Sequence, residues 1–194
     1  MARREKSPGE LPLLEWRDQC PKEGSAPRRL GWRAASIGLG TGLLGLTIVV
    51  PPTPRLVWNA SASAPIGLYA VDPGASIQVG DMVVARLPER WQTLAARRRY
   101  LPANVPLVKQ VAAVAGDQVC AVGAHVRVNG RRVAERRSAD GAGRPLPWWH
   151  GCIRLREGQF FLLMRGSPAS FDGRYFGATD SAHVIGKATL LWRR

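Results

Sequence analysis

A chain of 194 residues has room for one compact domain with an appendage, which excludes elaborate multidomain machinery. Apolar residues make up 45% of the chain and charged residues 22%, and this balance excludes a wholly disordered protein despite 21 glycines and 15 prolines. Lys and Arg number 28 against 14 Asp and Glu, and the resulting net charge of +14 favours an anionic partner, either a nucleic acid or a membrane surface.

A continuous apolar stretch covers residues 34–50 and predicts a transmembrane helix. Its 17 residues carry no charge, follow Arg33 and end before the Pro51-Pro52 pair. At about 1.5 Å per residue they extend about 25 Å, which is just enough to cross the hydrocarbon core of a bilayer. A cleaved signal peptide is the alternative, but its apolar region is usually shorter and lies nearer the N-terminus. We therefore expect an uncleaved anchor.

The charges that flank this anchor set its expected orientation. Arg28, Arg29 and Arg33 precede it, whereas Arg55 is the only basic residue among the twenty that follow it. By the positive-inside rule, residues 1–33 form a basic cytoplasmic tail and residues 53–194 form an exported, periplasmic domain. The sequence therefore predicts a single-pass protein of the inner membrane.

The exported domain is itself basic, with twenty basic and nine acidic side chains. Because the anchor holds this domain within reach of lipid, we expect its anionic partner to be the membrane surface, and we expect no nucleic acid.

The three cysteines are divided by the same topology. Cys20 falls in the tail, and Cys120 and Cys152 fall in the exported domain. The sequence contains no CxxC pair, so it lacks the ligands of a zinc ribbon and the redox pair of a thioredoxin-like site. An oxidising compartment permits a disulfide between Cys120 and Cys152, with two buried thiols as the alternative.

The exported domain has the pattern of a mainly β fold. Short apolar runs bounded by Gly, Pro and Asn predict strands at residues 66–71, 82–87, 107–115, 125–128, 160–164 and 183–192. Asn129-Gly130 predicts a type I′ hairpin turn, in which both residues need a positive φ. One helix is expected over residues 88–101. Residues 136–147 are expected to form an exposed, flexible loop within a β insertion around residues 120–152.

Lysine is scarce in the exported domain, where only Lys109 and Lys187 occur. Strand alternation places Lys109 on the same apolar face as Leu107, Val111 and Ala113. The side chain either reaches along the surface to water, or it is buried, in which case its pKa falls and the neutral amine can act as a base. A nucleophile elsewhere in the chain would favour the second interpretation.

Two serines, Ser61 and Ser63, stand in a loop of small residues just after the expected anchor. Their small neighbours leave room for a substrate backbone. The chain has neither an HExxH nor a GxSxG motif, so a zinc protease and an α/β-hydrolase have no support. A serine nucleophile here would need a neutral lysine to remove its proton.

Four segments of the chain resemble, in order, the sequence boxes of the type I signal peptidase family (S26). They are SASAPIGLY at 61–69, GDMVV at 80–84, LVKQVAAVAGDQV at 107–119, and SFDGRYFG at 170–177 followed by VIGKA. The similarity covers roughly residues 55–192 and is strongest to the TraF-like branch of conjugative transfer. It implies an antiparallel β domain with a LexA-like catalytic core behind one N-terminal transmembrane helix.

The resemblance also implies roles for individual residues. Ser63 matches the nucleophile of the family and Lys109 its general base. Ser61 matches a hydroxyl that helps to hold the oxyanion, although a plain surface-loop serine is the other interpretation. Asp172 and Arg174 match residues that support the active-site region.

A membrane-anchored serine endopeptidase of the signal peptidase type is therefore expected, with a Ser63/Lys109 dyad and neither metal nor organic cofactor. The implied substrate is an exported protein, either a conjugative pilin precursor or another preprotein, and further transfer or secretion components are possible partners. Water, or an amine of the substrate itself, would release the acyl-enzyme, and the second route gives a cyclic product.

The chain departs from the family pattern at residues 165–167, at Gly173 and at Gln110, and these departures favour a specialised enzyme over a housekeeping signal peptidase. A LexA-type repressor would share the Ser/Lys core but would carry a DNA-binding region in place of residues 34–50. A non-enzymatic, membrane-anchored assembly factor is the alternative from a different class.

Overall fold

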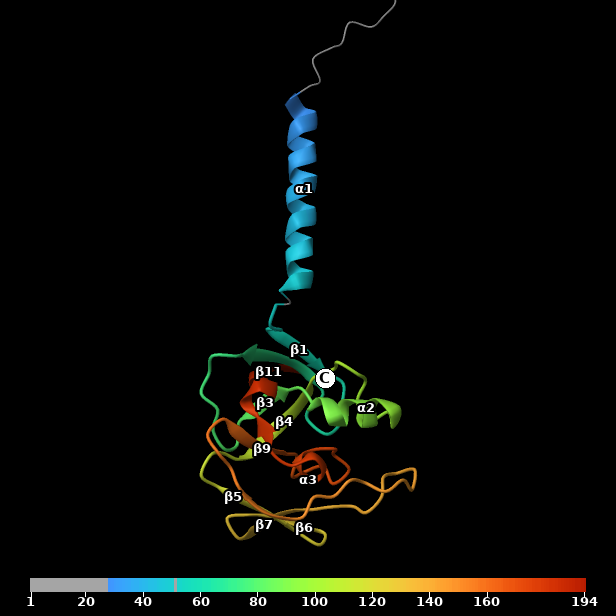
Figure 1. Ribbon diagram of the computed structural model, residues 1–194, viewed down its shortest axis with the longest axis vertical. Helices are drawn as coiled ribbons and strands as arrows, with labels where there is room; N and C mark the ends of the chain where they lie inside the picture. The colour runs from blue at the N-terminus through green and yellow to red at the C-terminus, as the bar shows by residue number, and fades with distance from the viewer. Residues whose placement is uncertain (1–27, 51) are drawn as a thin grey trace, which may run out of the picture. The chain divides into compact units, whose positions relative to one another are not determined.

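The computed structural model describes residues 28–50 and 52–194 and divides the chain into two units, Met1–Pro52 and Thr53–Arg194 (Figure 1). The first unit contains helix α1 (Arg28–Val49), in which Gly31–Val49 is long and apolar enough to cross a membrane. Its apolar side chains are exposed, as at Ile48, which is what a helix surrounded by lipid requires. Most of the expected tail, residues 1–27 with Cys20, lies outside the described residues.

The second unit is built on a seven-stranded antiparallel sheet, which confirms the predicted mainly β fold. Its strands follow the order β1-β2-β11-β3-β4-β9-β10. Their bounds are β1 (Leu56–Asn59), β2 (Gly67–Asp72), β3 (Met82–Ala85), β4 (Leu107–Ala113), β9 (Gln159–Leu163), β10 (Thr179–Asp180) and β11 (Val184–Arg193).

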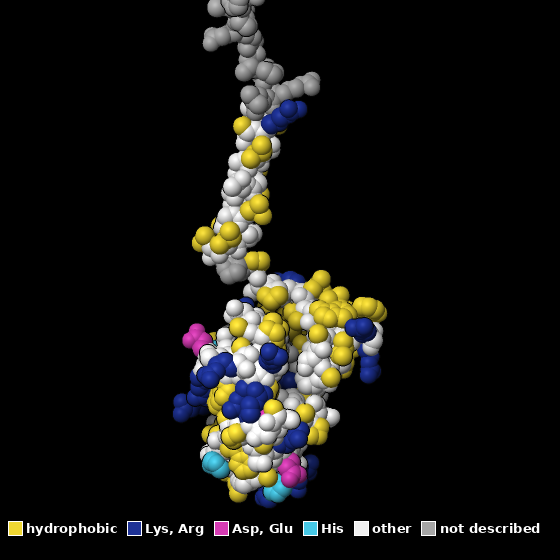
Figure 2. Space-filling view, turned by 90° about the vertical axis from the view of Figure 1, so that its right-hand side faces the viewer, with side chains coloured by type: hydrophobic (Ala, Val, Ile, Leu, Met, Phe, Trp, Pro, Cys, Tyr) yellow, Lys and Arg dark blue, Asp and Glu magenta, His cyan; other side chains and the backbone are white. Residues whose placement is uncertain are grey.

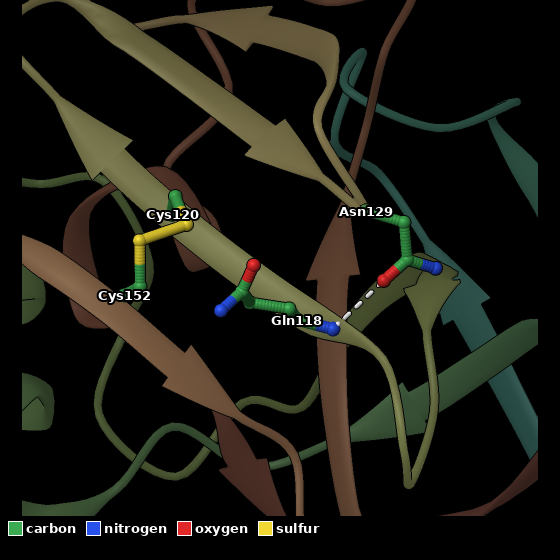
Figure 3. Close-up of a disulfide and its surroundings, with 4 residues drawn as sticks. All are labelled: Gln118, Cys120, Asn129 and Cys152. Carbon is green, nitrogen blue, oxygen red and sulfur yellow. Dashed lines mark hydrogen bonds between the residues drawn. A yellow bond between two sulfur atoms is a disulfide. The ribbon is translucent and has the colours of Figure 1, made fainter.

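A separate four-stranded sheet, in the order β7-β6-β5-β8, lies at the end of this unit opposite β1 (Figure 1). Its strands are β5 (Gln118–Val122), β6 (His125–Val128), β7 (Arg131–Glu135) and β8 (Gly151–Arg154). The turn between β6 and β7 has φ of 48° at Asn129 and 79° at Gly130, as the sequence predicts. Asn129 also accepts a hydrogen bond from the backbone N–H of Gln118 through its side chain (Figure 3).

Strands β5 and β8 carry the predicted disulfide between Cys120 and Cys152. The two residues stand directly opposite each other in the antiparallel pair, and their sulfur atoms are bonded (Figure 3). The disulfide therefore closes the inserted segment at its base, where the chain leaves and rejoins the larger sheet.

The predicted helix is shorter than expected: α2 covers Glu89–Arg97, and Arg99 then adopts a φ of 58°. This left-handed residue ends the helix and turns Tyr100 back, so that its N–H donates to the carbonyl of Ala95. Two short helical elements are absent from the prediction, α3 (Gly173–Phe176) and the 3-10 turn η1 (Ser181–His183), since the sequence pattern indicates neither.

Strand β4 lies between β3 and β9 and is buried on both faces. On one face, Val83, Val111 and Leu162 pack with Ala95 of α2. On the other, Ala113 packs against the four-stranded sheet. Six of the seven residues of β4, among them Lys109, are therefore withdrawn from water, and Gln110 is half-buried. The predicted alternation is wrong for Ala113, because a register shift between Val111 and Ala113 turns it to the opposite face.

The prediction of an exposed loop at residues 136–147 is wrong for half of its residues: Arg136 is buried, and Ala139, Asp140, Arg144, Leu146 and Pro147 are half-buried. Arg136 is 3% exposed, because its guanidinium donates to the carbonyls of Trp149 and Gly123. The carboxylate of Asp140 accepts hydrogen bonds from the hydroxyl of Tyr100 and from Arg144. Buried polar groups need such partners, and here they fasten the loop to the rest of the domain.

Lys and Arg side chains outnumber acidic ones on the face of the second unit shown in Figure 2. This distribution agrees with the excess of twenty basic over nine acidic side chains in residues 53–194.

Candidate active site

The small-residue loop after β1 is held in shape by the side chain of Asn59. The Nδ2 atom lies 3.0 Å from the carbonyl oxygen of Ser61, 3.2 Å from that of Ala64 and 3.0 Å from that of Pro65. The Oδ1 atom accepts from the N–H of Ser61 at 3.1 Å. One buried amide thus satisfies backbone groups on both sides of the loop, a use for which asparagine is well suited.

The hydroxyl groups of the two serines in this loop lie next to each other. The Oγ atoms of Ser61 and Ser63 are 3.0 Å apart, and the N–H of Ser63 donates to the hydroxyl of Ser61 at 3.4 Å. Ser61 is exposed and Ser63 is half-buried. Two hydroxyls and one backbone N–H are therefore gathered at the tip of the loop.

Lys109 meets this loop from the middle of β4. Its side chain is buried, with 4% of its surface exposed, and its Nζ atom donates to Ser63 Oγ at 2.8 Å and to Ser170 Oγ at 2.8 Å. Burial lowers the pKa of the Lys109 amine from 10.5 to about 8, while the charge of Asp172 opposes this change and that of Arg174 adds to it. Of the two interpretations of Lys109, the structure therefore shows the buried one.

Ser170 is a member of the site that sequence reasoning misses, although it begins the SFDGRYFG segment. It is 3% exposed, and its N–H donates to the carbonyl of Ser167. A hydroxyl two residues before Asp172 is the available signal, but nothing in the spacing indicates that Ser170 reaches a lysine 61 positions away.

Asp172 and Arg174 form a fully buried ion pair behind the lysine, with 2.7 Å between Arg174 Nη2 and Asp172 Oδ2. The Asp172 carboxylate also accepts from the N–H groups of Met164 and Arg174. The guanidinium of Arg174 donates in turn to the carbonyls of Met164 and Ser167. The pair thus joins the end of β9 to the segment that carries Ser170.

A cavity of about 360 Å³ opens beside the two serines and Lys109. Its walls include the apolar side chains of Leu101 and Val105 and the aromatic rings of Tyr100 and Phe171. Ser63 also borders a second hollow of about 390 Å³, whose lining includes Ser167 and Arg193. A peptide could therefore pass Ser63 with side chains directed into either space.

The structure thus brings together the predicted residues Ser61, Ser63 and Lys109, and it places Asp172 and Arg174 next to them. Cys120 and Cys152 belong to the other sheet. A hydroxyl hydrogen-bonded to a buried amine of lowered pKa has the geometry of an activated nucleophile with its base.

Comparison with known proteins identifies relatives over most of the chain. Residues 31–193 match the family described as signal peptidase, peptidase S26. A probable conjugal transfer protein TraF from Sinorhizobium fredii is 34% identical over 166 residues, which cover 76% of this chain and 85% of that protein. A plasmid transfer protein TraF from Escherichia coli is 32% identical over 146 residues, which cover 69% of this chain and 82% of that protein.

Among solved structures, a signal peptidase I from Enterococcus faecalis aligns with 59% of this chain and 98% of its own, at 19% identity and a TM-score of 0.35. The match to residues 31–193 spans both the apolar helix and the domain that carries Ser63 and Lys109. The chain therefore belongs to the signal peptidase family, peptidase S26, with TraF proteins of conjugal transfer among its relatives.

Proposed function

We propose that this protein is a membrane-anchored serine endopeptidase in which Ser63 is the nucleophile and Lys109 the general base. One observation carries the proposal: Lys109 Nζ lies 2.8 Å from Ser63 Oγ while its side chain is almost completely buried. Burial favours the neutral amine, and a neutral amine can accept a proton from a serine hydroxyl.

The reaction proceeds by acyl transfer. The lone pair of neutral Lys109 takes the Ser63 proton, and Ser63 Oγ forms a bond to the scissile carbonyl carbon. As the C–N bond breaks, the lysine ammonium returns the proton to the departing amine. During these steps an N–H of Lys109 donates to Ser170 Oγ, so this serine keeps the amine directed at the nucleophile.

Negative charge on the carbonyl oxygen needs donors that are already in place. The backbone N–H of Ser63 and the hydroxyl of Ser61 lie together beside the nucleophile, 3.4 Å apart. In the reaction the Ser61 hydroxyl rotates toward the oxyanion, and the N–H of Ser63 donates to the oxyanion in place of Ser61. The loop that presents them is held by Asn59, so little reorganisation is needed.

The proposed substrate is an exported protein. The names of the TraF relatives refer to conjugal and plasmid transfer, and on this basis we propose a pilin precursor of the same genetic element. The apolar helix α1 would anchor the enzyme in the inner membrane with its N-terminus in the cytoplasm, by the positive-inside rule. Water would release the acyl-enzyme as a linear product, or an amine of the substrate would release it as a cyclic one.

The proposal is tested by incubating the purified full-length protein, in detergent, with the exported pilin precursor and weighing the products. A cyclic product is lighter than the linear one by one water. Ser63→Ala should leave no product, because no other group forms the acyl-enzyme. Lys109→Arg should also be inactive, since a guanidinium does not lose its proton near neutral pH.

Lys187→Arg is the matched control. Lys187 is the other lysine of the domain, is 37% exposed and pairs with Asp81 at 2.9 Å. This variant should process the precursor at the rate of the unaltered protein. Substantial activity in Lys109→Arg would contradict the dyad, and full activity in Ser63→Ala would contradict the nucleophile.

A further inference from the structure

The cavity beside Ser63 and Lys109 shares a wall with a second cavity. The second cavity has a volume of about 230 Å³ and is lined mainly by the loop at residues 136–147, here called the inserted loop, and by the SFDGRYFG segment at residues 170–177. Tyr100 and Phe171 are the two residues that line both cavities. Their ring centroids are 5.2 Å apart, so the two rings together form the partition.

Tyr100 is fixed in this partition from two directions. The left-handed turn at Arg99 brings the chain back after α2, and the N–H of Tyr100 donates to the carbonyl of Ala95 at 2.9 Å. From the inserted loop, Asp140 accepts the hydrogen bond of the Tyr100 hydroxyl at 2.5 Å. Both ends of the residue are therefore held, which leaves the ring little freedom to swing away.

The inserted loop also forms hydrogen bonds with the segment that precedes Tyr100. Arg144 donates to the Asp140 carboxylate at 2.7 Å and to the carbonyl of Arg98 at 3.1 Å. Arg98 donates to the carbonyl of Pro145 at 2.7 Å. The two contacts of Arg98, with Arg144 and with Pro145, join positions 46 and 47 residues apart. They fix the loop next to Tyr100.

Phe171, the other residue of the partition, belongs to the segment that contacts Lys109. It stands between Ser170, which contacts Lys109, and the buried Asp172. Its ring stacks on Tyr175 with 5.7 Å between centroids and 5° between planes. Phe171 belongs to the segment that supports the base, whereas Tyr100 lies outside that segment, so Tyr100 is the residue of the partition to replace.

We propose that Tyr100 is a specificity-determining residue, whose ring ends the catalytic cavity and limits the size of the substrate side chain that this cavity accepts. The proposal rests on the proposed peptidase function. Without the ring, the cavity would extend into a further space of about 230 Å³, whose lining includes the apolar side chains of Leu146 and Phe171. A large apolar or aromatic side chain could then enter, because apolar burial would favour it.

The test uses synthetic peptides that span the mapped cleavage site, with each position before the scissile bond carrying alanine or phenylalanine in turn. In Tyr100→Ala, the ratio of kcat/KM for the phenylalanine peptide to that for the alanine peptide should rise by at least about tenfold at one position. The change should come from a lower KM of the phenylalanine peptide, while kcat on the alanine peptide stays within a few-fold.

Tyr100→Phe is the matched control, since it keeps the ring and removes only the hydroxyl. It should retain the preference of the unaltered protein. Trp148→Ala removes an aromatic ring that contacts the inserted loop through Arg137 but lines neither cavity, and it should also retain the preference.

An unchanged preference at every position in Tyr100→Ala would overturn the proposal. Equal loss of turnover on all peptides would also overturn it, because that result indicates a structural role. Failure of the peptidase proposal itself gives a different result, in which the unaltered protein cleaves no peptide.

Discussion

The lowered pKa of Lys109 predicts how the reactivity of Ser63 depends on pH. With a pKa of about 8, about a tenth of the amine is neutral at pH 7 and about nine-tenths at pH 9. At pH 7 the neutral fraction of an ordinary lysine would be about 300-fold smaller. The rate of acylation should therefore rise about tenfold from pH 7 to pH 9, with a midpoint near 8, and then level off.

The assay is the second-order rate of acylation of Ser63 by a penem inhibitor, measured from pH 6 to pH 10 on the full-length protein in detergent. Acylation isolates the step in which Lys109 takes the proton, so slow product release does not obscure the profile. Mass spectrometry of the adduct peptide confirms that Ser63 is the residue modified.

Two variants complete this experiment. Lys109→Arg should not be acylated at any pH, and Lys187→Arg should show the same midpoint as the unaltered protein. A midpoint near 6.5, the ordinary value of an imidazole, would refute the assignment of Lys109 as the base. A rate independent of pH in the folded protein would refute it as well.

Three further substitutions test the surroundings of the dyad. Ser61→Ala should lower kcat about 10²- to 10³-fold and leave slow turnover visible after long incubation; complete loss would contradict its role as one oxyanion donor. Asp172→Asn should lower the free energy of unfolding by about 3–5 kcal/mol in denaturant titrations, because Arg174 stays buried without its countercharge; a change below about 1 kcal/mol would contradict this. Replacing Cys120 and Cys152 by serine should cost about 3–4 kcal/mol for a sequence separation of 32 residues, and freely alkylated thiols in the native protein would contradict the disulfide.

Most of the strands that the sequence predicts contain apolar runs, and these runs are largely buried, as along β4 and β9. The sequence analysis misses β1, β5, β8 and β10. Strand β8 is exposed along its whole length, and β1 and β10 have four and two residues, whereas β5 was not predicted although Val119 and Ala121 are buried in alternation. Helix α2 ends earlier than its apolar pattern suggests, since Arg99 takes a left-handed conformation that side-chain periodicity does not report.

The candidate site was predictable only where its residues stand in recognisable segments. Ser61, Ser63 and Lys109 could be found in this way, as could Asp172. Ser170 and Asn59 act through contacts that the fold creates, Ser170 with a residue 61 positions away and Asn59 with the backbone of its own loop. The contact of Tyr100 with Asp140 spans 40 positions, and the sequence predicts an exposed loop there because Gly, Ser and Asp are common in loops.

Burial of Lys109 also affects the stability of the folded chain. The unfolded lysine binds its proton with a pKa near 10.5 and the folded one with a pKa of about 8, so between these values the unfolded state holds a proton that the folded state has released. Stability therefore rises with pH across this window, and below it the buried ammonium destabilises the fold by roughly 3 kcal/mol. For a domain stabilised by only about 5–15 kcal/mol, this is a substantial fraction. Lys109→Met should accordingly give an inactive protein with a higher free energy of unfolding than the unaltered protein at neutral pH. The difference between the two should disappear as the pH approaches 10.5.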